Sequence, residues 1–370
     1  MPSFNGQLNQ NLITNVLFNM IISQQVFADN ISSSGALVDR AKVDGTLYGD
    51  TKLYISTDVL KSYPWLNDAE TTNLLKVDRP ANPDVQAISI SIYRQIAVTI
   101  DNYLSKQAFQ NEGTFIQFQS SILAWLGDTK RVYDKTTYNA FIGTNETTVG
   151  EQSKTIELPA LTGTPGADEN AIYQLRALKI SEEIENIADE LADPNRLYND
   201  YENLREVDKS NLTIIMNNHY ANEFRKIDIP GIFHNEGIVP TADKLQYRYF
   251  GTVNGTGANA PTPNTTVRSM VEVDFNAVPM NDPTYDKKKH IFPGDLWPDG
   301  VAYDAGDTFT VDNKVICKII GGPLPPYMSA FVVETAFFNA RALNENHYLT
   351  FGHNPLEHLK NYPFITIREQ

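Results

Sequence analysis

Histidines near the C-terminal end are the residues whose type could bind a metal ion. His347, His353 and His358 fall close together in the chain, and Glu357 could add a carboxylate. Imidazole and carboxylate are common zinc ligands. However, His353 and His358 are five residues apart, and Pro355 lies between them, so one helix face cannot present both. The spacing favours packing or surface histidines, and we predict no metal site.

Other reactive groups also lack the arrangement that catalysis needs. Glu182 and Glu183 are adjacent in an expected helix, so their carboxylates do not face each other. The string GTGANA, residues 255–260, resembles a dinucleotide-binding loop, but Pro261 and Pro263 follow where a helix should begin. The sequence contains no GxSxG, HExxH or GK[ST] motif and no paired cysteines. We therefore predict no catalytic residues and no cofactor.

Composition limits the classes of protein further. The 370 residues carry a formal net charge of −15, which disfavours binding to nucleic-acid phosphates. The single cysteine, Cys317, excludes an internal disulfide framework and is expected to be buried in the apolar run VICKII. No stretch reaches the roughly 20 apolar residues of a membrane span, so we expect no membrane partner.

The first 30 residues are expected to form a helix with one apolar face rather than a signal peptide. The first basic residue is Arg40, and polar residues interrupt the apolar run. Helical spacing gathers one wide apolar face, which includes Leu12, Val16, Leu17 and Met20. Such a face needs a partner, which is either another subunit or the chain's own domain.

Residues 85–100 show the alternation of a half-buried strand. One parity is apolar (Ile88, Ile90, Ile92, Ile96, Val98 and Ile100), and the other is mostly polar. A strand of this length would reach about 50 Å, so part of it should project from the body. With the upstream run TLYGDTKLYISTDVL it predicts a long hairpin whose tip lies at Arg79 to Asp84. We expect this tip, with Arg79 and Asp84, and the strand residues Ile88, Ile90 and Ile92 to contact a neighbouring subunit; an ordinary core strand is the alternative.

The next segment, residues 101–140, predicts one long helix. Apolar residues recur at spacings of three and four, and no proline interrupts them. Such a helix would span about 50 Å and act as a strut. Gly113 and Gly127 allow the alternative of two shorter helices.

Further elements follow the long helix. A second helix should end at Asp193, because Pro194 follows, and a buried strand is expected at Leu212 to Met216. The phrase AGDTFTVDNKVICKIIGG, residues 305–322, reads as a turn and two strands. The inner face of the second helix is expected to hold Ile172, Leu175, Leu178, Ile184, Ile187 and Leu191.

The order of these elements resembles that of the major capsid proteins of tailed bacteriophages. The resemblance rests on the long strand pair, the strut helix, the phrase LTIIMNNHYANEFRK and the segment AGDTFTV. This is the Hong Kong 97-type capsid fold, shared with encapsulins and herpesvirus shells. It implies an α+β fold with an N-terminal arm, an extended hairpin called the E-loop, a long spine helix, and peripheral and axial domains.

Carried onto this chain, the resemblance implies five regions. The N-terminal arm is 1–40, the E-loop region 41–100, the peripheral domain with its spine helix 101–209 and the axial domain 210–300. Residues 301–370 then return as peripheral-domain strands and the C-terminus.

The resemblance also implies function. It indicates a structural subunit that self-assembles in the host cytoplasm into pentamers and hexamers of an icosahedral phage head, and resides in the virion. Implied partners are other copies of the chain, a separate scaffolding protein, a portal protein at one vertex and packaged double-stranded DNA without specific binding. An encapsulin-type compartment shell is one alternative. A carbohydrate-active enzyme that uses an Asp/Glu pair is the alternative from a different class.

Overall fold

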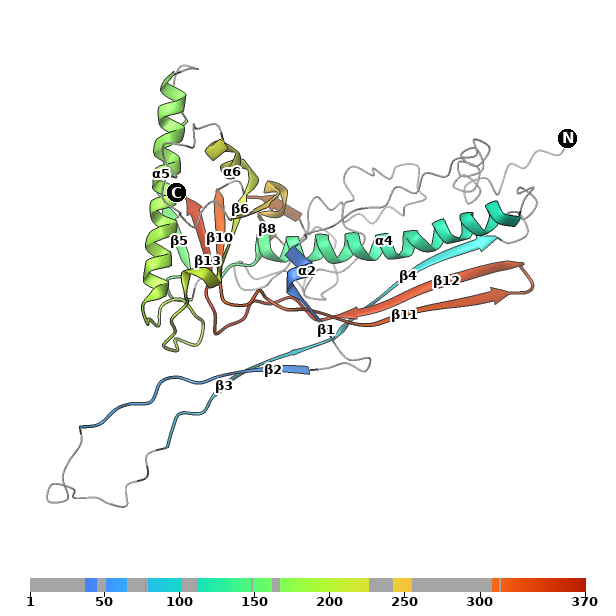
Figure 1. Ribbon diagram of the computed structural model, residues 1–370, viewed down its shortest axis with the longest axis horizontal. Coiled ribbons are helices and arrows are strands. Elements are labelled where there is room, and N and C mark those ends of the chain that lie inside the picture. The colour runs from blue at the N-terminus through green and yellow to red at the C-terminus, as the bar shows by residue number, and fades with distance from the viewer. Residues whose placement is uncertain are drawn as a thin grey trace.

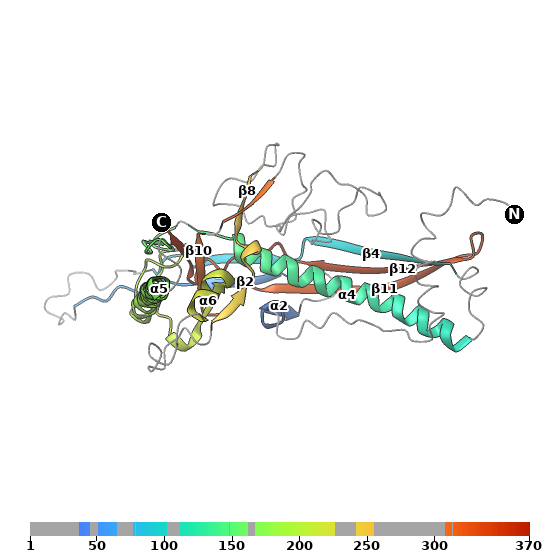
Figure 2. The same ribbon diagram turned by 90° about the horizontal axis from the view of Figure 1, so that it is seen from above.

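The chain folds into two bodies and a projecting hairpin (Figures 1 and 2). In one body, a long helix lies beside a four-stranded sheet; we call this the long body. In the other, a five-stranded sheet carries two helices; we call this the compact body. The computed structural model describes residues 37–44, 51–64, 77, 79–101, 112–147, 149–161, 167–225, 242–254, 308–312 and 314–370.

The long helix α4 (Glu112–Thr144) is the main element of the long body. Its 33 residues run without interruption through Gly113 and Gly127, which confirms one long helix over this range. At about 1.5 Å per residue it spans about 50 Å. The predicted start at Asp101 is wrong, because Asp101 pairs with Asn344 as the last residue of a strand.

The four-stranded sheet lies along this helix (Figure 1). Its strands β11 and β12 form a long antiparallel hairpin, β4 pairs antiparallel with β12, and β1 pairs parallel with the start of β11. The short helix α2 (Leu37–Ala41) precedes β1. The strand bounds, in spatial order, are β1 (Lys42–Asp44), β11 (Tyr327–Asn339), β12 (Asn344–His353) and β4 (Ile92–Asp101).

The expected strand at residues 85–100 is divided in two. Its alternation is confirmed, because side chains of one parity are covered and those of the other are exposed. A single strand is wrong, because pairing stops at Ile90 and Ser91. Before this break β3 (Asp84–Ser89) pairs with β2 (Thr51–Ser56), and after it β4 joins the long body. The break therefore separates the hairpin from the sheet.

The compact body holds one mixed sheet, helix α5 (Ala167–Ala192) and helix α6 (Asn218–Arg225). The sheet comprises β5 (Ser153–Ile156), β13 (Phe364–Glu369), β10 (Val315–Gly321), β6 (Leu212–Asn217) and β7 (Asp243–Leu245). Short 3-10 turns are η1 (Lys209–Asn211) and η4 (Tyr247–Tyr249), and β8 (Gly251–Asn254) pairs with β9 (Thr308–Val311).

Helix α5 ends just before Asp193 and Pro194, as the sequence predicts. Its inner face differs from the prediction, because Leu175 and Leu178 are about half exposed. Ala177 and Ile180 are buried in their place, together with the expected Ile184, Ile187 and Leu191. Ala177 and Ile180, rather than Leu175 and Leu178, lie on the side of the helix that packs against β6, β10 and β13.

The two sheets combine segments that the sequence analysis assigned to separate domains. In the compact body, β5 comes from 101–209, β6 from 210–300, and β10 and β13 from 301–370. In the long body, β11 and β12 return to lie beside α4. Strand pairing between distant segments therefore crosses the expected boundaries at 209 and 300.

His353 lies in the core of the long body, where it bridges β12 and α4. The carbonyl of Asn354 can only accept a hydrogen bond, so His353 Nδ1–H donates to it (2.9 Å). Its Nε2 then accepts from the Tyr133 hydroxyl (2.7 Å), and the Tyr327 ring stacks on the imidazole. Burial lowers the pKa of His353 to about 4. The imidazole is therefore neutral in the folded protein at neutral pH.

This arrangement predicts an acid-dependent loss of stability. The unfolded chain binds the His353 proton at a pKa near 6.5, whereas the folded protein binds it only near 4. The stabilisation is complete above pH 6.5 and is lost as the pH falls towards 4. Between pH 7 and pH 5, the free energy of unfolding should fall by about 2 kcal/mol more in the wild type than in His353→Gln. Urea unfolding at both pH values measures this, and equal pH dependence of the two proteins would contradict it.

Candidate assembly interface

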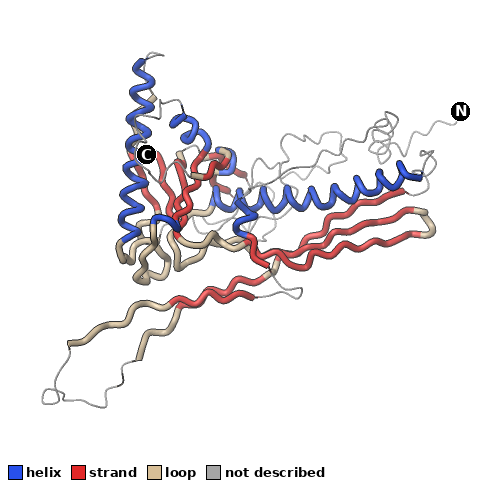
Figure 3. Tube along the Cα trace, viewed as in Figure 1, coloured by secondary structure: helices blue, strands red, loops and turns tan. Residues whose placement is uncertain are grey.

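The hairpin formed by β2 and β3 belongs to neither sheet and runs in the direction opposite to the long body (Figure 1). The two strands are antiparallel, with Thr51 opposite Ser89 and Ser56 opposite Asp84. Beyond Ser56 the chain continues outward without strand pairing, and Figure 3 shows these outer segments as loops. The two-stranded part is therefore the stem, and its outer end lies at Ser56 and Asp84.

One face of the stem packs on the chain's own long body. Tyr54 and Ile88 lie in an apolar cluster with Ile90, Met328 and Leu359. The neighbouring Gln86 is also buried; its side-chain amide donates to His358 O (3.0 Å) and accepts from the Lys360 backbone N–H (3.0 Å). This face of the hairpin is thus covered within one chain.

The isoleucines expected to contact a neighbouring subunit lie on this covered side. Ile88, Ile90 and Ile92 have exposed fractions of 1%, 7% and 5%. They are buried inside the single chain, so the expectation that they meet a second subunit is corrected. Strand alternation identified two faces, but not which of them the chain itself covers.

The opposite face of the stem is apolar and exposed. Leu53, Ile55 and Val85 have exposed fractions of 59%, 65% and 51%. Ile55 is directly opposite Val85, and Leu53 is opposite Ala87, so the four side chains share one face. Further out, Val59, Leu60, Tyr63 and Val77 are also exposed. Contiguous apolar side chains on a projecting element are typical of a protein–protein contact.

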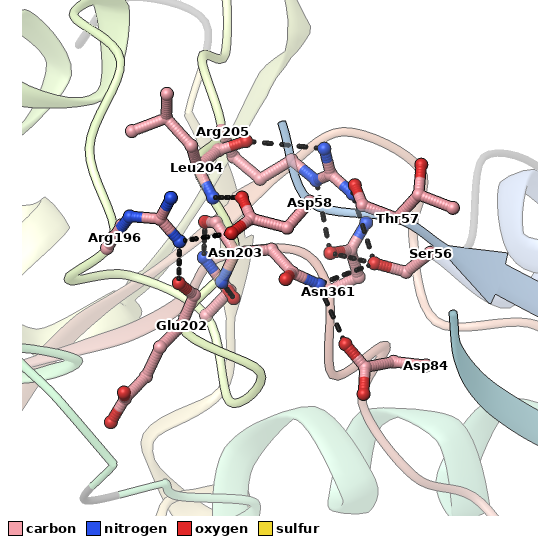
Figure 4. A network of polar contacts seen from close by, with 11 residues as sticks. Ser56, Thr57, Asp58, Asp84, Arg196, Glu202, Asn203, Leu204, Arg205 and Asn361 are labelled. Atoms are coloured by element: carbon pink, nitrogen blue, oxygen red, sulfur yellow. Dashed lines mark hydrogen bonds and ion pairs between the residues drawn. The ribbon is translucent and has the colours of Figure 1, made fainter. Parts of the chain in front are cut away.

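A polar network holds the outer end of the stem against the compact body (Figure 4). The Asn203 side-chain amide donates to Ser56 Oγ (2.8 Å) and to Asp84 Oδ2 (3.0 Å). Arg205 donates to Ser56 Oγ (3.0 Å), and both Ser56 and Arg205 donate to Asn361 Oδ1. We call these residues the hairpin anchor; it joins three segments that are far apart in sequence.

The anchor extends two residues beyond the stem. Asp58 accepts from Arg196 (2.7 Å) and from the Leu204 backbone N–H (3.1 Å). The hydrogen bond from Arg196 is the main reason that the pKa of Asp58 falls to about 2. Arg196 also donates to Glu202 O, and Arg205 donates to Thr57 O. The hairpin is therefore held at Asp84 on the β3 side and as far as Asp58 on the β2 side.

The predicted tip at Arg79 to Asp84 is partly wrong. Asp84 lies at the anchor, whereas Arg79 is exposed on the outer segment beyond it. Residues 65–76 and 78, which connect the two outer segments, lie outside the described residues. So do Leu12, Val16, Leu17 and Met20 of the N-terminal arm. The anchor residues Asn203 and Arg205 were missed because no sequence pattern relates them to Ser56.

His353, His358 and Cys317 do not form a reactive site among the described residues. His353 bonds Tyr133, while His358 bonds Asp200 Oδ2 (2.7 Å) and Asn145. Burial raises the pKa of Cys317 to about 12, which makes its thiol unreactive. In the described ranges no group of three or more His, Cys, Asp or Glu side chains could hold a metal ion. None of the helices described is long and apolar enough to span a membrane. The GTGANA string lies outside these ranges.

Known proteins similar to this chain are phage capsid proteins. A family model described as Phi29-like phage major capsid protein matches residues 3–263. The capsid structure of Staphylococcus phage Andhra aligns with a TM-score of 0.59 at 12% identity, covering 94% of this chain and 87% of that chain. A chain from the structure of the head fiber and inner core protein of native bacteriophage P68 aligns with a TM-score of 0.55 at 11% identity, covering 94% and 91%. No curated protein matches by sequence.

These comparisons test the fold expected from the sequence. At such low identity the structural likeness establishes the fold alone, and it confirms a mixed helix and sheet fold of the tailed-phage capsid type. None of these findings supports the encapsulin or carbohydrate-active alternatives.

Proposed function

The chain belongs to the Phi29-like phage major capsid protein family, and from this premise we propose that its copies assemble into the pentamers and hexamers of an icosahedral phage head. Family membership makes the protein a structural capsid subunit that resides in the virion. Assembly takes place in the host cytoplasm, and the subunit catalyses no reaction.

The exposed apolar face of the hairpin is the observation that carries this proposal. Leu53, Ile55 and Val85 point away from the body that covers the other face of the stem. The anchor holds the stem in this position, and among the described residues only the face with Tyr54 and Ile88 is covered. A second copy can cover the exposed face. Contacts between two different surfaces of identical copies close into rings when the rotation between copies allows it.

We propose revised regions for this shell subunit. We assign α4 and the four-stranded sheet to the peripheral domain, and the five-stranded sheet with α5 and α6 to the axial domain. The E-loop is the hairpin between residues 45 and 91. Residues 1–40 are the N-terminal arm, whose apolar face, with Leu12, Val16, Leu17 and Met20, gives a second contact between subunits.

Partners other than copies of the chain follow from the same role. We assign a separate scaffolding protein, a portal protein at one vertex and packaged double-stranded DNA. The net charge of −15 supports enclosure of DNA without specific binding, because phosphates are repelled rather than held.

Limited trypsin digestion tests the proposed hairpin contact. Lys61 lies on the exposed outer segment, and Lys76 follows in the chain; Arg79 is a poor site because Pro80 follows it. Trypsin should cut after Lys61 and Lys76 in unassembled subunits and spare both bonds in particles, since a neighbouring copy covers the hairpin. Electron microscopy of the particle sample should be used to check that it contains closed shells. Dissociating the same particles should restore cleavage, and equal cleavage before and after dissociation would count against the contact.

A further inference from the structure

The C-terminal end of the long helix α4 is buried between the two bodies. Tyr138, Phe141 and Ile142 belong to an apolar cluster that also contains Ile215 of β6 and Ile320 of β10. The last turn of α4 contains no basic residue, although the carbonyl groups at a helix C-terminus are unpaired and carry partial negative charge. A cation from elsewhere in the fold would stabilise this end of the helix.

Lys318 of β10 supplies that cation. Its side chain is completely buried. The ammonium donates to the Asn145 carbonyl just after the helix (2.8 Å), to Thr366 Oγ1 (2.9 Å) and to Glu146 Oε1 (3.3 Å). Burial lowers the pKa of Lys318, whereas the Glu146 carboxylate favours its charged form. An ammonium has three donors, and all three find acceptors here.

Glu146 continues the network into the compact body. It accepts from Arg368 of β13, and Arg368 also pairs with Asp312. Burial alone would raise the pKa of Glu146, but Lys318 and Arg368 lower it overall. Two cations and two carboxylates thus form one paired group between the end of α4 and strands β10 and β13. Removing one member leaves a buried charge unpaired, which is strongly destabilising.

The second ion cluster of the compact body is arranged differently. Arg176 of α5 is buried and donates to Glu369 and to Glu223 of α6 (3.1 Å). Tyr220 also donates to Glu369 (2.6 Å). All of these partners lie in α5, α6 and β13, so this cluster stabilises one body and does not reach α4.

We propose that Lys318 couples the long helix to the five-stranded sheet, so that the long and compact bodies open and close as one cooperative unit. The residues that pair across this joint, Asn145 and Lys318, are 173 positions apart in the chain. The Asn145 carbonyl, just after α4, receives its hydrogen bond from Lys318 only when β10 is in place. In an assembled shell, a mechanical force from neighbouring subunits is then transmitted through α4 without separating the long body from the compact body.

Hydrogen exchange measured by mass spectrometry on purified unassembled subunits tests this coupling. In the wild type, peptides covering 138–147 and 212–217 should exchange with the same opening free energy, because they belong to one unit. In Lys318→Met, which keeps an unbranched side chain one atom shorter and removes its charge, exchange at 138–147 should accelerate roughly 100-fold relative to 212–217. Arg176→Met is the matched control and should leave this ratio within about threefold of the wild type.

Glu146→Gln provides a second, milder variant if Lys318→Met does not fold. It removes one carboxylate charge and leaves Lys318 its bonds to Asn145 and Thr366. The same preferential acceleration at 138–147 is expected, by roughly 10-fold. Independent exchange of the two peptides in the wild type would overturn the proposal. So would a uniform acceleration over both peptides in the Lys318 and Glu146 variants, as expected of simple destabilisation.

Discussion

Replacing Leu53 and Ile55 with aspartate should yield a folded subunit that no longer assembles into shells. Both side chains lie mostly exposed on the outer face of the hairpin, so the change leaves the buried core of the subunit intact. Burying one such side chain at a contact contributes about 1.5–3 kcal/mol, and burying an unpaired carboxylate instead adds a further cost. The subunit concentration needed for assembly should therefore rise by at least about 100-fold.

Sedimentation and electron microscopy measure this loss of assembly. Circular dichroism and the urea midpoint should be unchanged, which separates an assembly defect from misfolding. The control variant exchanges Leu53 for methionine and Ile55 for leucine; it keeps an apolar face of similar volume and should assemble. Shell formation by the aspartate variant at wild-type concentrations would contradict the role given to this face.

Two glycines of α4 should respond in opposite directions to the same substitution. At Gly127 no atom lies within 4 Å of an added Cβ, and the position is exposed. Alanine should therefore stabilise the protein by about 0.5–1 kcal/mol, because glycine is the poorer helix former. At Gly143 an added Cβ would lie 2.0 Å from Tyr249 O and 2.5 Å from its carbonyl carbon. Helix and η4 backbone would have to separate.

Gly143→Ala should consequently lower the free energy of unfolding by about 3 kcal/mol or more, or prevent folding. Urea unfolding followed by circular dichroism measures both variants under the same conditions. Gly127→Ala controls for the helix propensity of alanine in this helix. A Gly143→Ala protein as stable as the wild type would show that α4 and η4 do not make the close approach described here.

Several elements of this fold could be predicted because their signals are local. The long apolar stripe indicated α4, the alternation of isoleucines indicated the strands around residues 85–100, and Pro194 marked the end of α5. Each signal depends on steric and hydrophobic preferences within a few neighbouring residues. The absence of the tested catalytic motifs and the net charge of −15 were likewise properties of the sequence alone.

The candidate interface was decided by contacts between distant segments. The sequence showed that the hairpin has two faces, but both carry apolar residues: Ile88 on one, and Ile55 and Val85 on the other. The chain covers the first face with Met328 and Leu359, more than 200 residues away, and holds the stem through Asn203, Arg205 and Asn361.

The same reason explains the remaining differences between prediction and structure. Leu175 and Leu178 fit the helical period of α5, yet the sheet packs against another side of that helix. In the sequence Gly143 looks like any other glycine in a helix, and only the structure shows that the Tyr249 backbone lies against it. Lys318 likewise looks like a polar residue that interrupts an apolar strand, and only the structure shows its bond to Asn145 at the end of α4. Periodicity tells which residues share a face because backbone geometry sets it locally; tertiary packing alone decides which face is covered, since that depends on segments whose positions no local pattern encodes.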